Sequence, residues 1–138
     1  MTTTQASDLE QIRRLNHEYA WAIDNFRLDD LLTFFTRDGV FDMRPLGAPE
    51  AVAGTDALRK MFAGMIDEMD GCIHLMMNHL VDLAGDRATG RVYCHSFSLM
   101  PDGTKPEVFV CYEDSYARTN GKWQFTSRTV TPLLTTDR

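Results

Sequence analysis

Two side chains in this sequence could together act as a general base. Asp24 stands at the end of the first helical pattern, and His74 lies in the strand-like run Cys72-Ile73-His74. A carboxylate that holds one imidazole nitrogen leaves the other free to take a proton near neutral pH. The pair therefore predicts proton abstraction, provided that the fold joins two residues fifty positions apart.

The local pattern around each residue leaves a second interpretation open. A carboxylate at a helix C-terminus faces the negative end of the helix dipole, at a cost of roughly 0.3–1 kcal/mol, and such a broken local rule often marks function. Asp24 could equally be solvated or cap the following corner. A single strand histidine is often structural, and alternation places His74 on one strand face with Cys72, Met76 and Asn78.

Four further residues are candidates for binding a substrate. Arg128, between small hydroxyl residues, needs an anionic partner if it is buried; a sheet edge or a structural ion pair would also explain it. Tyr19 could present its hydroxyl to a ligand or pack in the core, and His95 lies on the next predicted strand. Cys72 is about 6–7 Å from His74 along one face, too far for direct activation, so we expect it to be a structural cysteine or to line the pocket.

Composition excludes several classes of function. The formal net charge of −6 opposes binding to nucleic acid or to an anionic membrane. The three cysteines are an odd number without disulfide or zinc spacing, which predicts free thiols in a reducing cytoplasm. The N-terminal segment lacks a basic and apolar leader, and no long apolar run follows. We expect a cytoplasmic protein with one domain over residues 1–138 and a core at about 7–132.

The sequence predicts neither a metal nor a cofactor. His74 and His79 are five residues apart in a predicted strand, so they should point to opposite faces. No H-E-x-x-H, paired C-x-x-C, acidic calcium loop or glycine-rich phosphate loop is present.

The order of the predicted elements indicates an α+β fold. A capping box at Ser7-Asp8-Leu9-Glu10 predicts a first helix from about Asp8 to Asp24, followed by a second helix that ends near Phe35. A short strand at 40–43, a lid-like loop at 44–53 and a third helix from Gly54 come next.

From Gly71 onwards the pattern becomes β. Four strands are predicted at about 71–83, 88–100, 107–118 and 122–131, with a strong hairpin signal at Asn120-Gly121. We expect a curved, cone-shaped antiparallel sheet that wraps around the helices and leaves a cavity at its open end. Apolar candidates for its outer face predict a homo-oligomer; they are Phe109, Val110, Tyr112 and Tyr116.

The whole chain resembles the SnoaL-like, nuclear transport factor 2-like (NTF2-like) superfamily of α+β cones. The resemblance covers roughly residues 7–132 and rests on the order and spacing of several motifs. These are a capped helix ending in Tyr19 and Asp24, the helix start Val52-Ala53-Gly54-Thr55-Asp56-Ala57-Leu58, the strand opening Cys72-Ile73-His74, and Asn120-Gly121-Lys122-Trp123 before Arg128.

The chain is most similar to the branch of scytalone dehydratase, the bile-acid dehydratases and hexachlorocyclohexane dehydrochlorinase. This resemblance implies that Asp24 holds His74 and that the pair is the base of an elimination. It also implies pocket roles for Cys72 and for Arg128, which would stabilise a departing anion, with His95 as a second pocket histidine and Tyr19 as a hydroxyl donor. Tyr19 stands where the dehydrochlorinase has a lysine, which favours water over chloride as the leaving group.

The sequence thus predicts a cofactor-independent lyase, a dehydratase acting on a small apolar cyclic or polyketide-like substrate, and a dimer or trimer. An isomerase or cyclase could use the same base. A non-catalytic ligand-binding or assembly module is a further alternative. It predicts that Asp24 and His74 lie too far apart to hydrogen-bond, or that side chains fill the cone.

Overall fold

The computed structural model describes residues 1–135 and has three α-helices packed against one sheet. The helices are α1 (Thr3–Asp24), α2 (Leu28–Thr33) and α3 (Thr55–Asp67), with a 3-10 turn, η1, at Arg44–Leu46. The strands are β1 (Phe35–Asp42), β2 (Val52–Ala53), β3 (Gly71–Ala84), β4 (Arg87–Leu99), β5 (Glu107–Thr119) and β6 (Lys122–Pro132). The predicted α+β class is confirmed.

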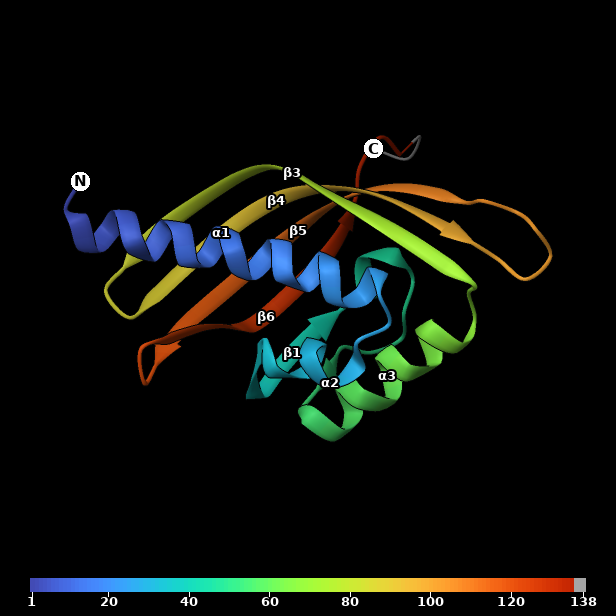
Figure 1. Cartoon of the computed structure of the whole chain (residues 1–138), viewed down its shortest axis with the longest axis horizontal. Helices are drawn as coiled ribbons and strands as arrows, with labels where there is room; N and C mark the ends of the chain where they lie inside the picture. Colours follow the sequence, from blue (N-terminus) through green and yellow to red (C-terminus); the bar gives the residue numbers. More distant parts are fainter. Residues whose placement is uncertain (136–138) are drawn as a thin grey trace.

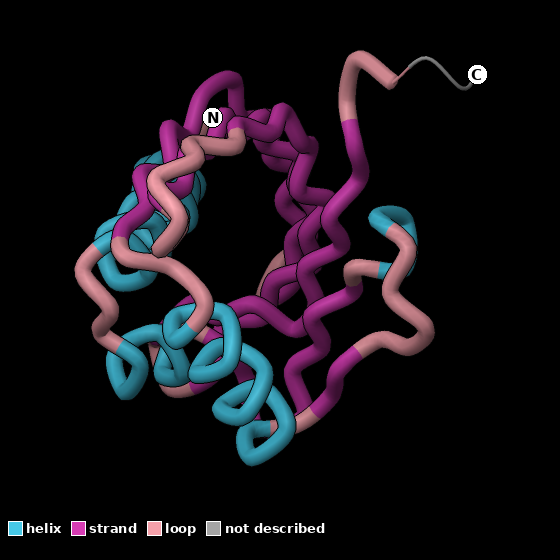
Figure 2. Tube along the Cα trace, turned by 90° about the vertical axis from the view of Figure 1, so that its right-hand side faces the viewer, coloured by secondary structure: helices cyan, strands magenta, loops and turns pink. Residues whose placement is uncertain are grey.

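The six strands form one curved sheet in the order β2-β1-β6-β5-β4-β3. α1 lies across its inner face, while α2 and α3 lie together below one end (Figure 1). Figure 2 shows strands and helices closing into a ring when the molecule is viewed from its side. The sheet is mixed rather than wholly antiparallel, because β1 pairs with β6 in parallel.

The first helix begins earlier than the sequence analysis predicted. Thr2 is its N-cap: its hydroxyl accepts a hydrogen bond from the Gln5 amide at 3.0 Å, and the Gln5 side chain accepts from the Thr2 amide at 2.8 Å. This earlier capping box supersedes the predicted one, and Ser7 lies inside the helix, where it accepts from Gln11. The helix ends at Asp24, as predicted.

The segment between β1 and α3 is more ordered than the predicted loop. β1 begins at Phe35, so it is longer than the short strand expected at 40–43. Within residues 44–53, η1 forms a turn and β2 pairs with β1 through Val40–Ala53 and Phe41–Val52. The predicted lid is therefore tied to the sheet at its far end.

The core lies between α1, α3 and the inner face of the sheet. The even-numbered residues of β5 point into it, so Val110, Tyr112 and Tyr116 are buried and do not lie on the outer face as predicted. The outer face instead exposes Ile73, Leu75, Leu80 and Tyr93. The outer face does expose apolar side chains, as predicted, but most of the residues predicted to form it lie elsewhere. No helix in residues 1–135 is long and apolar enough to cross a membrane.

A β-bulge changes the phase of β3. Met76 pairs with Cys94 and His79 pairs with Val92, so β3 carries one residue more than β4 across this step. The bulge leaves Asn78 exposed and turns His79 to the inner face, where it reaches the buried Tyr116. The predicted opposite facing of His74 and His79 is therefore wrong, as is the placement of Asn78 beside His74.

Candidate active site

The last turn of α1 lies against the start of β3 and brings Asp24 to His74. His74 Nδ1 is 2.7 Å from Asp24 Oδ1, and the His74 backbone amide donates to Asp24 Oδ2 at 3.0 Å. One carboxylate therefore holds both the ring and the backbone of the histidine. The two residues that the sequence analysis paired lie within hydrogen-bonding distance.

This geometry assigns different roles to the two ring nitrogens of His74. The carboxylate of Asp24 accepts a hydrogen bond from Nδ1–H, so Nε2 carries the free lone pair. Among residues 1–135 no side chain hydrogen-bonds to Nε2, and Nε2 is not among the buried atoms that lack a partner. The side chains of His74 and Asp24 are 15% and 19% exposed. Nε2 is therefore open to an incoming molecule while the rest of the ring is held.

Cys72 completes the group from the same face of β3. Its thiol donates to Asp24 Oδ1 and to the carbonyl of Ile23, each at 3.6 Å. Burial raises the pKa of Cys72 to about 12, and the negative charge of Asp24 adds to the rise. The thiol is protonated at neutral pH, which argues against a role as a nucleophile.

The unfavourable position of Asp24 at a helix C-terminus is offset by its partners. Its carboxylate accepts from the His74 amide, from His74 Nδ1 and from the Cys72 thiol. The negative end of the α1 dipole and the carboxylate both favour positive charge at this point. A protonated imidazole at His74 would therefore be stabilised by two aligned sources of negative charge.

Arg128 lies in a second polar cluster, sealed inside the protein. Its guanidinium donates from Nε and Nη2 to the two oxygens of Asp114, each at 2.8 Å, and both side chains are fully buried. Burial lowers the pKa of Arg128, but the charge and hydrogen bonds of Asp114 outweigh it and raise the pKa overall. Among the described residues no hydrogen bond or ion pair joins Arg128 to the dyad. A structural ion pair, one of the two alternatives, explains this arginine; the predicted direct pocket role lacks support.

Three residues that the sequence analysis did not consider for this cluster complete it. Asn16 of α1 accepts from Arg128 Nη2 and donates to the Tyr116 hydroxyl, which donates to Asp114 at 2.6 Å. His79 Nε2 lies 3.3 Å from the same hydroxyl. The sequence contains one signal that could have revealed this cluster. Asn16 is a polar residue within the apolar stripe of α1, between Leu15 and Tyr19.

Tyr19 is a core residue. Its ring makes edge contacts with Phe35, Phe62, Tyr112 and Phe125, and the Arg128 guanidinium lies over it at 4.5 Å. Burial raises the pKa of Tyr19 to about 12, although Arg128 opposes the rise. No hydrogen bond in residues 1–135 links its hydroxyl to Asp24 or His74. Of the two interpretations, core packing is the one that these contacts favour.

His95 lies on the outer face of the sheet, away from the dyad. Residues directly opposite in an antiparallel ladder share a face; His95 pairs with the exposed Leu75, whereas His74 pairs with Ser96. The His95 ring stacks on Phe109 and its Nε2 is 3.3 Å from Glu107. The prediction that His95 is a second pocket histidine is wrong, because strand alternation turns it outward.

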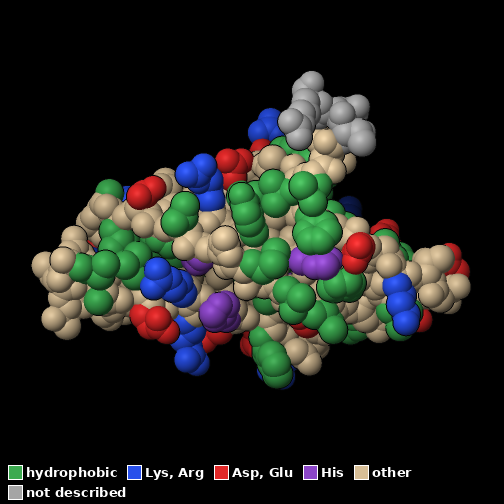
Figure 3. Space-filling model, turned by 90° about the horizontal axis from the view of Figure 1, so that it is seen from above, with side chains coloured by type: hydrophobic (Ala, Val, Ile, Leu, Met, Phe, Trp, Pro, Cys, Tyr) green, Lys and Arg blue, Asp and Glu red, His purple; other side chains and the backbone are tan. Residues whose placement is uncertain are grey.

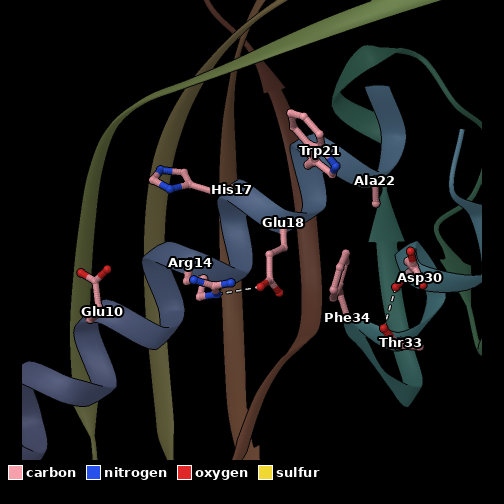
Figure 4. Close-up of a pocket in the computed structure, with 9 residues that line it drawn as sticks. All are labelled: Glu10, Arg14, His17, Glu18, Trp21, Ala22, Asp30, Thr33 and Phe34. Atoms are coloured by element: carbon pink, nitrogen blue, oxygen red, sulfur yellow. Dashed lines mark hydrogen bonds and ion pairs between the residues drawn. The ribbon is translucent and has the colours of Figure 1, made fainter. Parts of the chain in front are cut away.

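A groove of about 670 Å³ lies between α1 and α2 and does not include the dyad. Figure 4 shows Trp21 and Phe34 on either side of it, with the Arg14–Glu18 ion pair along α1 and His17 pointing away from this pair. No described carboxylate hydrogen-bonds to His17. The groove therefore lacks an oriented base, and Asp24 with His74 is the stronger candidate for catalysis.

Comparison with known proteins places the chain in a family. The SnoaL-like domain matches residues 4–129. The chain belongs to the SnoaL-like family. The uncharacterized protein Rv2910c of Mycobacterium tuberculosis is 28% identical to this SnoaL-like chain over 134 residues, which cover 95% of this chain and 89% of the relative.

Solved structures share this SnoaL-like fold. A protein provisionally named aromatic ring hydroxylase, from Novosphingobium aromaticivorans, is 29% identical with a TM-score of 0.89, covering 94% of this chain and 92% of the other. A protein provisionally named scytalone dehydratase, from the same organism, is 21% identical with a TM-score of 0.90, covering 100% and 92%. A hexachlorocyclohexane dehydrochlorinase, LinA type 2, is 13% identical with a TM-score of 0.84, covering 94% and 87%. The fold thus includes named dehydratases and dehydrochlorinases, and the predicted resemblance is confirmed.

Proposed function

We propose that this protein is a cofactor-independent lyase, a dehydratase in which Asp24 and His74 form the general base. The observation that carries the proposal is the 2.7 Å contact between His74 Nδ1 and Asp24 Oδ1, which leaves Nε2 accessible. The assembly-module alternative predicted either that these groups would be too far apart to hydrogen-bond or that side chains would fill the cone. The contact contradicts the first of these two expectations and in that respect favours the enzyme.

The proposed reaction moves one proton and releases water. His74 Nε2 takes a proton from the carbon next to a substrate carbonyl, and Asp24 together with the α1 C-terminus stabilises the imidazolium. The electron pair of the broken C–H bond forms the new double bond as the hydroxyl on the next carbon departs. The imidazolium returns its proton to that hydroxyl, which leaves as water, so the base is regenerated.

The neighbours of His74 favour a mostly apolar substrate. Cys72 and Met76 share its face of β3 and are both partly buried beside the core. Neither brings a charge, because the Cys72 thiol is protonated at neutral pH. A small cyclic or polyketide-like β-hydroxy ketone has the required acidic C–H and an apolar body.

The test is turnover of a panel of cyclic β-hydroxy ketones, followed by the absorbance of the enone product. His74→Ala and Asp24→Asn should each lose about 10²–10⁴-fold in rate with the fold intact by circular dichroism. His95→Ala is the matched control, since this histidine lies on the outer face. Near-normal turnover in His74→Ala would refute the proposal. Deuterium exchange at the acidic carbon without loss of water would assign the base to an isomerase instead.

We also propose that a second copy of the chain covers the outer face of the sheet. Figure 3 shows hydrophobic side chains gathered on the face seen from above, interrupted by charged ones. Ile73, Leu75, Leu80 and Tyr93 are exposed there, and a patch of this kind is typical of an interface. Light scattering should give a dimer or trimer, and Leu80→Glu should shift it towards monomer. A monomeric wild-type protein would contradict this assignment.

A further inference from the structure

We propose that Asp24, Cys72 and His74 form a binding site for Zn²⁺ that switches off the general base. The site itself requires only the geometry of these three residues. The loss of catalysis on binding rests on the function proposed above.

The three side chains present three kinds of ligand atom at metal-binding spacing. Asp24 Oδ, Cys72 Sγ and His74 N all lie within 4.8 Å of one another. Around a tetrahedral zinc ion, bond lengths of about 2.0–2.3 Å place sulfur and oxygen ligands about 3.6 Å apart. Cys72 Sγ and Asp24 Oδ1 are already 3.6 Å apart.

The contact between His74 and Asp24 must lengthen when the ion binds. A nitrogen and an oxygen bound to the same zinc ion are about 3.4 Å apart, whereas His74 Nδ1 and Asp24 Oδ1 are joined by a 2.7 Å hydrogen bond. The ion replaces the proton between them, so the two atoms need to separate by about 0.7 Å.

The charges around the cluster favour a cation. In the described part of the chain, no lysine or arginine forms an ion pair with Asp24, whose partner is His74. The Cys72 thiol also points at the carbonyl of Ile23, in the last turn of α1, where the helix dipole is negative. A divalent ion here meets the carboxylate, the thiolate formed on binding and the negative helix end.

The surroundings also hold the ligands in place and leave one coordination position open. The His74 backbone amide fixes Asp24 Oδ2 at 3.0 Å, which orients the carboxylate as an outer-shell partner does in known metal sites. Because His74 and Asp24 are 15% and 19% exposed, water can supply a fourth ligand. Three protein ligands with an open fourth position are the pattern of accessible zinc sites.

Metal binding changes the tautomer of the base. His74 coordinates through Nδ1, so the proton on Nδ1 leaves and Nε2 takes one from solvent, which keeps the ring neutral. The Cys72 thiol loses its proton to solvent as the thiolate binds. In the zinc-bound form Nε2 is a hydrogen-bond donor and can no longer accept a substrate proton.

The experiment is a zinc titration of the metal-free protein in competition with a chromophoric chelator. Wild type should bind one Zn²⁺, and Cys72→Ala should lose more than about 100-fold in affinity, because removing a ligand should cost more than the 10–100-fold typical of an outer-shell change. Cys111→Ala is the matched control, since Cys111 is a free thiol elsewhere on the sheet, and should bind like wild type.

Two spectroscopic readouts identify the ligands directly. Co²⁺ in place of Zn²⁺ should give a thiolate-to-cobalt charge-transfer band in wild type and Cys111→Ala but not in Cys72→Ala. Nitrogen-15 NMR of His74 should show the proton moving from Nδ1 to Nε2 when Zn²⁺ is added. Equal zinc affinity in wild type and Cys72→Ala, or no charge-transfer band, would overturn the site.

These readouts need no substrate, so the two proposals fail independently. A protein that binds Zn²⁺ through Cys72 but dehydrates no ketone of the panel refutes the function and leaves the metal site standing. A protein that turns over substrate but retains full activity at saturating Zn²⁺ refutes the switch.

Discussion

Two of the pairs that a carboxylate forms with a nitrogen group in residues 1–135 differ in access to solvent. Asp24 and His74 meet at 2.7 Å at the end of α1, with both side chains partly exposed. Asp114 and Arg128 meet at 2.8 Å across β5 and β6, with both fully buried. The distances are nearly equal, so distance alone does not separate a reactive pair from a structural one.

The difference lies in what remains unsatisfied in each pair. His74 keeps Nε2 free and within reach of solvent. Arg128 is enclosed between the rings of Tyr19, Tyr112 and Phe125, and of its atoms only Nη1 lacks a partner among the described residues. The first pair can exchange a proton with a visiting molecule, whereas the second organises the core.

The largest expected effect would come from breaking the accessible pair. Asp24→Asn keeps the shape but can present an amide N–H to His74 and removes the charge that stabilises the imidazolium. Turnover should fall by about 10²–10⁴-fold, with a change in the free energy of unfolding below about 1 kcal/mol. Steady-state kinetics and urea denaturation measure the two quantities. A variant that unfolds without losing rate per folded molecule would reverse the assignment of the pairs.

The buried pair should show the opposite balance. Arg128→Met leaves the Asp114 carboxylate buried without its partner, which should lower the free energy of unfolding by about 3–5 kcal/mol. Urea denaturation gives this value. The double variant Asp114→Leu/Arg128→Met should cost less than the sum of the single variants, because it leaves no uncompensated charge. Additive losses would show that the ion pair is not a unit.

Acid should weaken the buried cluster before it reaches the ion pair. Burial lowers the pKa of His79 to about 4 in the folded protein; the negative charge of Asp114 opposes this shift and the positive charge of Arg128 adds to it. The ordinary value is about 6.5. Between these values the unfolded state binds more protons, so the free energy of unfolding should fall as pH drops from about 6.5 to 4. The slope should stay below about 1.4 kcal/mol per pH unit.

His79→Gln should flatten this part of the pH profile, measured by urea denaturation at several pH values. His95→Gln, on the outer face of the sheet, is the control and should leave the profile as it is. An unchanged slope in His79→Gln would show that another group carries the proton.

The smallest effect should come from a third pair, whose nitrogen-to-oxygen distance is similar to that of the other two. Arg14 and Glu18 meet at 2.8 Å on α1, but their side chains are 75% and 44% exposed. Arg14→Ala should lower the free energy of unfolding by only about 0.3–0.5 kcal/mol. High salt should make this effect smaller still, because it screens the attraction between the two charges. A loss above 2 kcal/mol in urea denaturation would contradict the view that solvent exposure determines how much an ion pair contributes to the free energy of unfolding.

The boundaries of β3 to β6 and the pairing of Asp24 with His74 could be predicted because they depend on local signals and on one resemblance. Hairpin turns and alternation gave β3 to β6 to within a residue or two. The start of α1 could not be chosen in the same way, since Thr2 and Ser7 both offer capping boxes. Two local solutions of similar quality leave the choice to the rest of the fold.

The buried ion pair shows why the remaining site residues were harder to place. Counting back from the Asn120-Gly121 turn, where Thr119 pairs with Lys122, would set Asp114 opposite Ser127. A register shift between Ser115 and Tyr116 moves Arg128 there instead. Bulges carry no reliable local signal in the sequence. The face of the sheet to which a side chain points can therefore be predicted along a strand only as far as its first bulge.

The bulge in β3 also has an evolutionary consequence. Because the extra residue lies between Met76 and His79, deleting one residue there would restore simple alternation and leave both His74 and His79 on the inner face. Loss of one residue at the bulge should therefore be tolerated in descendants of this chain, whereas a one-residue insertion or deletion elsewhere in β3 would turn part of its inner face outward and should be purged. The bulge is thus a position at which the strand can become shorter without changing which residues face the core.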